Sequence, residues 1–300
     1  MLSANHKGAI WMMLSMTAFT VNDVFMKLLA TEMPFFQALF IRGLGTSIAM
    51  LVLGYVLGQI RWDHSARDWK LIGLRTLAEL GAAYFFLSAL FHMPLANVSA
   101  ILQALPLTVT LAGAVFLGEA VGWRRMLAIL VGLVGVLLIV RPGGEGFTIY
   151  SAYALGAVLC VTVRDIAARQ VSREVPSVMI AVVAAFGVTV CVGIASAFIT
   201  WQPIDREAAG HLLGATVFII GGYLFSVMAM RSGEISFVAP FRYSSLIVAL
   251  ILGYLVFSDW PDHLTIIGAI IVVATGLFTF HREQQMARRQ KQQARGLRIR

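Results

Sequence analysis

Ten long apolar segments follow one another along the chain and are separated by short polar stretches. Within each segment the apolar residues are continuous rather than alternating, and the runs exceed the roughly 9–11 residues of a barrel strand. The segments run approximately from Gly8 to Ala30, Pro34 to Gly58, Leu71 to Phe91, Leu95 to Gly118, Met126 to Val140, Ile149 to Val171, Pro176 to Thr200, Leu212 to Arg231, Ile235 to Ser258 and Leu264 to His281. We therefore expect an all-α integral membrane protein with ten transmembrane helices.

The composition supports this class. Hydrophobic residues make up 59% of the chain, charged residues 13%, and the mean hydropathy is +0.83. A soluble domain carries about 45–50% apolar and about 25% charged residues. Cys160 and Cys191 both lie in apolar stretches, and no spacing of residues indicates a metal site, a cofactor or a catalytic nucleophile. The sequence therefore does not predict an enzyme.

The first half of the chain recurs in the second half. Three positions repeat at a constant spacing of 142 residues: Asp23 with Asp165, Lys27 with Arg169, and Pro34 with Pro176. Because each copy holds five spans, an odd number, the second copy enters the membrane in the opposite orientation. We expect one five-helix repeat at residues 1–142, an inverted repeat at 143–281 and a basic tail at 282–300. Two inverted repeats are typical of secondary transporters that work by alternating access.

Basic residues indicate how the chain is oriented. With the N-terminus inside, Lys and Arg gather at the cytoplasmic ends of the spans, Arg164 among them, and only Arg141 and Arg206 fall outside. Since cytoplasmic loops carry the basic excess, we expect a multi-pass inner-membrane protein with both termini in the cytoplasm. The net charge of +8 therefore requires no nucleic acid. The tail either contacts anionic lipid headgroups or is a solvated topology signal.

Several charged residues fall within the spans, where each costs about 2.5–3.5 kcal/mol near a helix centre if unpaired. Three pairs have the i,i+4 spacing that places two side chains on one helix face: Asp23 with Lys27, Arg75 with Glu79, and Asp165 with Arg169. Each pair could be purely structural and tie helices together. Alternatively, the first and third pairs could be gates at opposite ends of a transport pathway, with Glu79 and Arg75 in substrate binding or proton coupling.

Proline marks two further candidate sites. Pro240 frees backbone carbonyls in the ninth span, so we expect local unwinding beside Arg242 and Tyr243, which we predict to contact substrate. Gln103, near Pro106, is the corresponding polar residue of the fourth span. Two tyrosines occupy equivalent places in the repeats and could line a cavity or simply pack: Tyr84 and Tyr223.

These features together resemble a known family. The duplicated spans, Leu117 to Glu119, the Arg141-Pro142-Gly143 turn, the Ala239-to-Tyr243 run and Pro261-Asp262 are similar to the EamA branch of the drug/metabolite transporter superfamily. Within that branch, Asn22-Asp23 and Asp165-Ile166 are similar to bacterial S-adenosylmethionine uptake carriers, whose relatives carry riboflavin or export metabolites. The resemblance implies a ten-helix basket whose cavity is lined by helices one, three, four, six, eight and nine.

The sequence therefore predicts a secondary transporter for a small polar or zwitterionic organic metabolite. With no ATPase motif, active transport would draw on a proton or counter-substrate gradient. The alternatives are an exporter of the same fold or, from other classes, a channel or a membrane-embedded enzyme.

Overall fold

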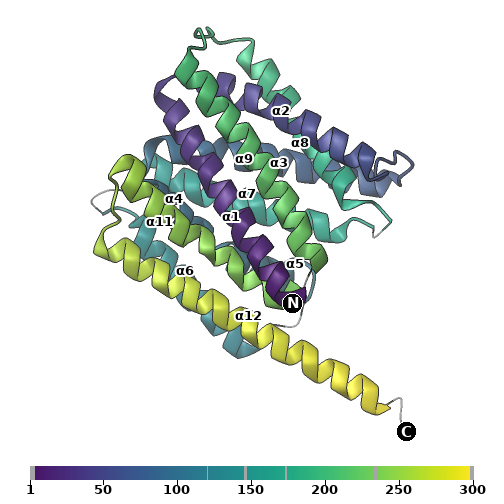
Figure 1. Ribbon diagram of the computed structural model, residues 1–300. Coiled ribbons are helices and arrows are strands. Elements are labelled where there is room, and N and C mark those ends of the chain that lie inside the picture. The colour runs from purple at the N-terminus through teal and green to yellow at the C-terminus, as the bar shows by residue number, and fades with distance from the viewer. Residues whose placement is uncertain (1–3, 120, 145–146, 173, 233–234, 298–300) are drawn as a thin grey trace.

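The computed structural model describes residues 4–119, 121–144, 147–172, 174–232 and 235–297. All regular structure in these ranges is helical, and ten spans are long and apolar enough to cross a membrane, as predicted. The spans consist of α1 (Ala4–Leu28) with η1 (Leu29–Thr31), α2 (Phe35–Val56), α3 (Ala66–His92), α4 (Leu95–Leu102) with α5 (Leu105–Phe116), α6 (Trp123–Val140), α7 (Ile149–Gln170), α8 (Ser177–Ser196), α9 (Arg206–Ser232), α10 (Ile235–Val238) with η2 (Ala239–Tyr243) and α11 (Ser244–Phe257), and α12 (His263–Leu297). The start of α1 and the far end of α12 lie toward the same end of the bundle (Figure 1).

Proline sets the start of three helices. Pro34, Pro94 and Pro176 directly precede α2, α4 and α8, each with the extended ψ of a residue outside the helix. Proline is tolerated at a helix start because the first N–H groups have no intrahelical acceptor. Short loops then return the chain across the bundle.

Helix packing has a two-fold pseudo-symmetry. α1 packs against α9, and α7 packs against α3, so the first span of each half pairs with the third span of the other half. α2 packs against α8 on one side of the bundle and α6 against α12 on the opposite side (Figure 1). The Ser47 and Thr189 hydroxyls lie 2.9 Å apart and 142 positions apart in sequence, the spacing of the repeat. Equivalent residues meet only at a two-fold axis, so the α2–α8 crossing lies on it.

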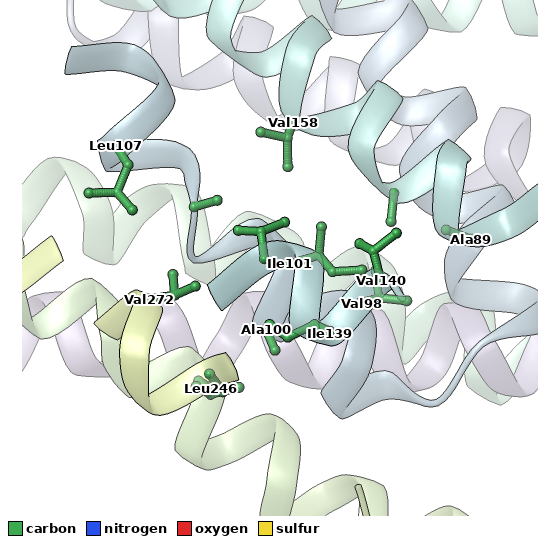
Figure 2. Close-up of a cluster of buried hydrophobic side chains, with 14 of the residues drawn as sticks. Ala89, Val98, Ala100, Ile101, Leu107, Ile139, Val140, Val158, Leu246 and Val272 are labelled. Carbon is green, nitrogen blue, oxygen red and sulfur yellow. The ribbon is translucent and has the colours of Figure 1, made fainter. Parts of the chain in front are cut away.

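A core cluster fills the other side of the bundle, where α4, α6, α11 and α12 meet. Ile101, Ile139, Leu246 and Val272 are buried in it (Figure 2). Close helix approach permits this packing, because an added Cβ at Gly268 would lie 2.5 Å from the carbonyl oxygen of Gly135. Small residues allow membrane helices to approach in this way.

A charge pair joins the adjacent ends of α6 and α12. The Arg141 guanidinium bonds the Asp262 carboxylate, which also accepts the backbone N–H of Thr265 at 2.8 Å. Partial burial acts to raise the pKa of Asp262, but the bonds from Thr265 and Arg141 outweigh it and lower this pKa below its usual 3.8. Arg141 ends α6 with a φ of 51°.

Two spans are broken near the middle of the bundle. The fourth span turns at Gln103 and Ala104 between α4 and α5, and the ninth narrows to the 3₁₀ segment η2, which contains Pro240. The α-helix is interrupted at Pro240 as predicted, but by a tighter 3₁₀ turn rather than by unwound backbone. The Gln103 amide donates to the Ser245 hydroxyl at 2.9 Å, again 142 positions away, so the two breaks lie against each other.

Candidate functional site

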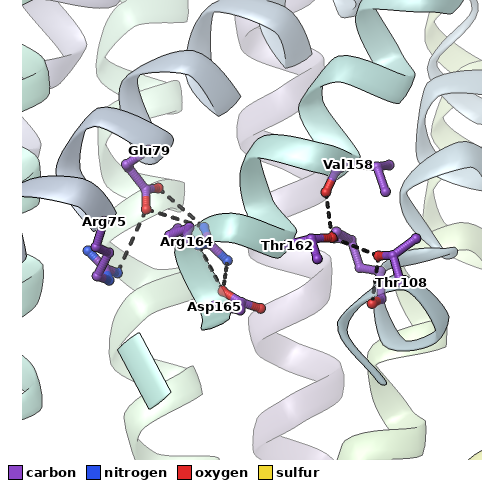
Figure 3. A network of polar contacts seen from close by, with 8 residues as sticks. Arg75, Glu79, Thr108, Val158, Thr162, Arg164 and Asp165 are labelled. Carbon is purple, nitrogen blue, oxygen red and sulfur yellow. Dashed lines mark hydrogen bonds and ion pairs between the residues drawn. The ribbon is translucent and has the colours of Figure 1, made fainter. Parts of the chain in front are cut away.

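A network of charged side chains connects α3 with α7 in the interior (Figure 3). Arg164 donates to both carboxylate oxygens of Glu79 at 3.3 Å and to Asp165 at 2.9 Å. Arg75 lies 3.7 Å from Glu79, so this predicted i,i+4 pair forms. Beside it, the Thr108 and Thr162 hydroxyls lie 2.8 Å apart and join α5 to α7. The first and second halves of the chain are thus linked by a partly buried ion pair, between Glu79 and Arg164.

A cavity of about 220 Å³ opens beside this network, between α2, α3, α7, α8 and α9. Its polar lining includes Arg42, Arg75, Glu79, Arg164 and Tyr223. The remaining lining is mainly apolar. The cavity lies between helices of both halves and is the most polar of the described cavities.

Arg42 links the cavity to Asp23. Its Nη1 donates to Asn22 Oδ1 at 3.3 Å, and the Asn22 amide donates to Asp23 at 2.9 Å. The sequence placed Arg42 inside a span but gave no reason to assign it to a site. Thr46 follows Arg42 by four residues and also lines the cavity, so this i,i+4 spacing of polar residues was the signal that could have identified the face.

The predicted pairing of Asp23 with Lys27 is wrong. Lys27 instead donates to the backbone carbonyls of Leu90 and Met93 at 3.1 and 2.5 Å. Its ammonium also lies 5.3 Å from the centre of the Phe257 ring. Carbonyls at the end of α3 have no intrahelical donor and offer Lys27 an alternative partner.

The predicted pairing of Asp165 with Arg169 is also wrong. Asp165 bonds Arg164, its neighbour in the chain, whereas Arg169 donates to Glu119 at 3.1 Å. Arg164 therefore does not belong with the basic residues at the cytoplasmic ends. It lies in the interior because Glu79 and Asp165 together compensate its charge.

Arg242 and Tyr243 separate from each other in η2. Arg242 is exposed and lies within electrostatic range of Asp165. Tyr243 points toward α12, where an added Cβ at Gly276 would collide with its hydroxyl, and it lines an apolar groove of about 600 Å³. This position does not fit the substrate contact predicted for Tyr243.

The two symmetry-related tyrosines do not face one cavity. Tyr223 lines the polar cavity, whereas Tyr84 lies in an aromatic cluster with Phe35, Phe85 and Tyr153. Inverted repeats place equivalent residues at opposite depths, so equivalence in sequence does not bring two side chains together unless they lie at the axis.

One group could hold a metal ion by geometry. Ligand atoms of Glu32, Glu207 and His211 lie within 4.8 Å of one another, with Glu32 Oε1 2.7 Å from His211 Nδ1. The sequence pattern did not predict this group, because Glu32 is far from the other two residues along the chain. The Glu32–His211 contact ties η1 to α9.

A ten-span helical bundle with a polar cavity between its two halves is an architecture found in membrane transporters. The chain belongs to the EamA-like transporter family, which matches residues 6–141 and 148–280. This confirms the resemblance drawn from the sequence, to the drug/metabolite transporter superfamily. The protein is a multi-pass transporter of small metabolites and not an enzyme.

Relatives over nearly the full chain carry different solutes. The S-adenosylmethionine uptake transporter of Rickettsia conorii is 26% identical over 283 residues, 94% of this chain and 95% of the relative. The pseudopaline exporter CntI of Pseudomonas aeruginosa is 26% identical over 276 residues, 89% of this chain and 93% of the relative. The riboflavin transporter of Vibrio cholerae is 25% identical over 293 residues, 95% of this chain and 96% of the relative. A protein of known crystal structure matches 91% of this chain and 94% of its own chain, with a TM-score of 0.59 and 19% sequence identity. At this identity the match supports the fold alone.

Proposed function

We propose that this protein is a secondary transporter that moves a small polar or zwitterionic metabolite across an inner membrane by alternating access. The observation that carries the proposal is the polar cavity between helices of both halves, with Glu79 and Arg164 joined across it. Charged groups are expensive at membrane depth and are retained there where they serve a solute pathway. The two units that would move are residues 1–142 and 143–281.

Charged contacts at the two ends of the bundle support a gating cycle. Arg169 at the end of α7 pairs with Glu119, which follows α5. By the repeat, Lys27 at the end of α1 corresponds to Arg169, and Asp259, which follows α11, to Glu119. Lys27 lies within electrostatic range of Asp259, but no ion pair within 4.0 Å joins these two described residues. Arg169 thus holds a carboxylate at one end, whereas Lys27 at the other end bonds backbone carbonyls instead, so the two ends differ in their contacts.

The cavity has groups for each part of a zwitterion. Glu79 could face a cationic group, the arginines a carboxylate, and the Tyr223 ring a planar or cationic group. S-adenosylmethionine, the solute of one relative, carries both charges and an aromatic base, so it heads the set of candidate solutes. Arg242 and Gln103 remain candidates for contacting the solute at other points of the pathway. Asp23 and Glu79 remain candidates for proton coupling.

Export is the second candidate direction, since one relative of similar identity is the exporter CntI. We take the basic excess, including the tail at 282–300, to place both termini in the cytoplasm. Membrane lipid surrounds the spans, and the driving gradient would be protons or a counter-substrate.

Counterflow in proteoliposomes tests the function. Purified protein is first screened by thermal shift against S-adenosylmethionine, riboflavin and amino acids, and vesicles are then loaded with each stabilising solute. A transporter accumulates labelled solute against the trapped pool, and Glu79→Gln should reduce that uptake while Glu174→Gln, at the membrane surface, should not. Flux without counterflow would indicate a channel, and product formation without movement an enzyme. Uptake that does not change with pH would rule out proton coupling.

A further inference from the structure

We propose that Arg42 and Arg75 form a carboxylate-binding subsite, which makes the transported solute a zwitterion with a free carboxylate. This inference rests on the proposed transport function and identifies the chemistry of its solute. Arg42 reaches the cavity from α2 and Arg75 from α3. Tyr223 lies within electrostatic range of both guanidinium groups.

The hydrogen-bonding capacity of these two arginines is largely unused. Each guanidinium has five N–H donors. Among the described residues, Arg42 gives one side-chain hydrogen bond, to Asn22, and Arg75 gives none, since its contact with Glu79 is a 3.7 Å ion pair. Arg42 Nε and Arg75 Nη1 are enclosed by protein and have no partner there, so a ligand in the cavity would bond the other N–H groups of these two side chains. A guanidinium with unused donors on a cavity wall matches a planar carboxylate, which can accept two parallel N–H bonds from it.

Charge compensation separates this subsite from the neighbouring arginine. Arg164 bonds both Glu79 and Asp165, through all three of its guanidinium nitrogens. Arg75 shares Glu79 at longer range, and Arg42 reaches Asp23 only through the Asn22 amide. The unoccupied donors are therefore on the α2 and α3 side of the cavity.

The overall charge of the cluster limits the ligand. Three guanidinium groups line the cavity, and three carboxylates, Asp23, Glu79 and Asp165, lie around them, so the charges of these six groups balance when all are ionised. A dianionic phosphate ester would bring excess negative charge into a poorly hydrated site, whereas a zwitterion brings none. The cavity of about 220 Å³ is smaller than the roughly 300–1,000 Å³ of drug-sized sites, so it fits an amino-acid end group.

Matched ligand pairs test the subsite on the wild-type protein. The probes are S-adenosylmethionine with its decarboxylated analogue, methionine with methioninamide, and riboflavin, which lacks a carboxylate. In at least one pair, we expect the compound with the carboxylate to bind and the compound without it to bind about 10- to 100-fold more weakly. This is the effect of losing a hydrogen bond to a charged group. Equal binding within every pair, or no binding by any carboxylate, would overturn the proposal.

Variants test the residues. Arg42→Gln and Arg75→Gln should abolish discrimination within a pair, and Arg42→Lys should restore part of it because the charge beside Asp23 returns. Arg67→Gln, at an exposed arginine near the start of α3, is the matched control. Size-exclusion profiles and ligand-free melting curves identify variants that fail to fold. The comparison of matched ligands on the wild-type protein does not depend on the folding of any variant.

Counterflow distinguishes failure of the subsite from failure of the function. If only riboflavin shows counterflow, the protein is a transporter but the subsite is wrong. If no probe shows counterflow while a carboxylate probe binds with the expected discrimination, the transport function is wrong and the subsite stands as a binding site.

Discussion

Removing the carboxylate of Glu79 should destabilise the protein more than any comparable change at its surface. In Glu79→Gln the side chain keeps its size but loses its charge, so Arg75 and Arg164 face each other without the anion between them. Arg164 retains Asp165, whereas Arg75 retains no ion pair among the described residues.

The structure sets the expected magnitude. Breaking a buried ion pair by removing one partner costs about 3–5 kcal/mol, because an uncompensated charge stays behind. The side chains of Arg75, Glu79 and Arg164 are 17%, 23% and 25% exposed, so partial hydration from the cavity reduces the cost to about 2–3 kcal/mol. Glu119→Gln breaks the Arg169 pair, in which the side chains are 47% and 45% exposed, and should cost less than about 1 kcal/mol.

Thermal unfolding in detergent, followed by tryptophan fluorescence, compares the two variants. At about 2 °C per kcal/mol for a chain of this size, Glu79→Gln should melt about 4–6 °C below wild type and Glu119→Gln within about 2 °C. The double variant Arg75→Gln/Glu79→Gln should recover part of the loss, since it removes the stranded charge. Equal losses at Glu79 and Glu119, or strictly additive losses in the double variant, would refute the reasoning.

Three further stability changes follow from local structure. Ser258→Gly should raise stability by about 0.5–1 kcal/mol, because Ser258 ends α11 with a φ of 55° that glycine adopts freely; an unchanged melting point would argue against strain there. Gly268→Ala should cost about 1–3 kcal/mol by its clash with the α6 backbone, whereas Gly73→Ala, in open space on α3, should be neutral or stabilising. Asp262→Asn should cost up to about 1 kcal/mol at neutral pH. Because the pKa of Asp262 is lowered, its stabilisation is present above the usual carboxyl pKa and is lost as the pH falls through the folded value, so this difference should disappear in acid and persist above it.

The sequence predicted the spans well because continuous apolar runs have one stable structure in a membrane. It also predicted the break at Pro240, since proline removes a backbone donor wherever it lies in a helix. The partners of charged residues were harder to predict. The i,i+4 spacing indicates which side chains can meet on one helix. Lys27, however, bonds carbonyls 63 and 66 positions away at the end of α3, and these carbonyls compete with Asp23 for the Lys27 ammonium because they have no intrahelical donor.

The site was predicted in part for the same reason. Glu79 and Arg75 pair within α3 and could be read from spacing, whereas Arg42 and Arg164 enter the cavity only through the packing of α2 and α7. Arg164 lies six residues before the end of α7, so from sequence alone it resembled a basic residue of the cytoplasmic surface. Tyr243 follows Arg242 directly, but in η2 its hydroxyl lies against Gly276 of α12, whereas Arg242 lies within electrostatic range of Asp165 on α7.

Locking one end of the bundle tests alternating access most directly. In a chain with Cys160 and Cys191 replaced by alanine, Glu119→Cys and Arg169→Cys are joined by a short cleavable bismaleimide, and counterflow of the identified solute is measured before and after cleavage. The account predicts that the cross-linked protein binds solute but shows no counterflow, and that cleavage restores it. Counterflow at the full rate with the cross-link intact would contradict the account.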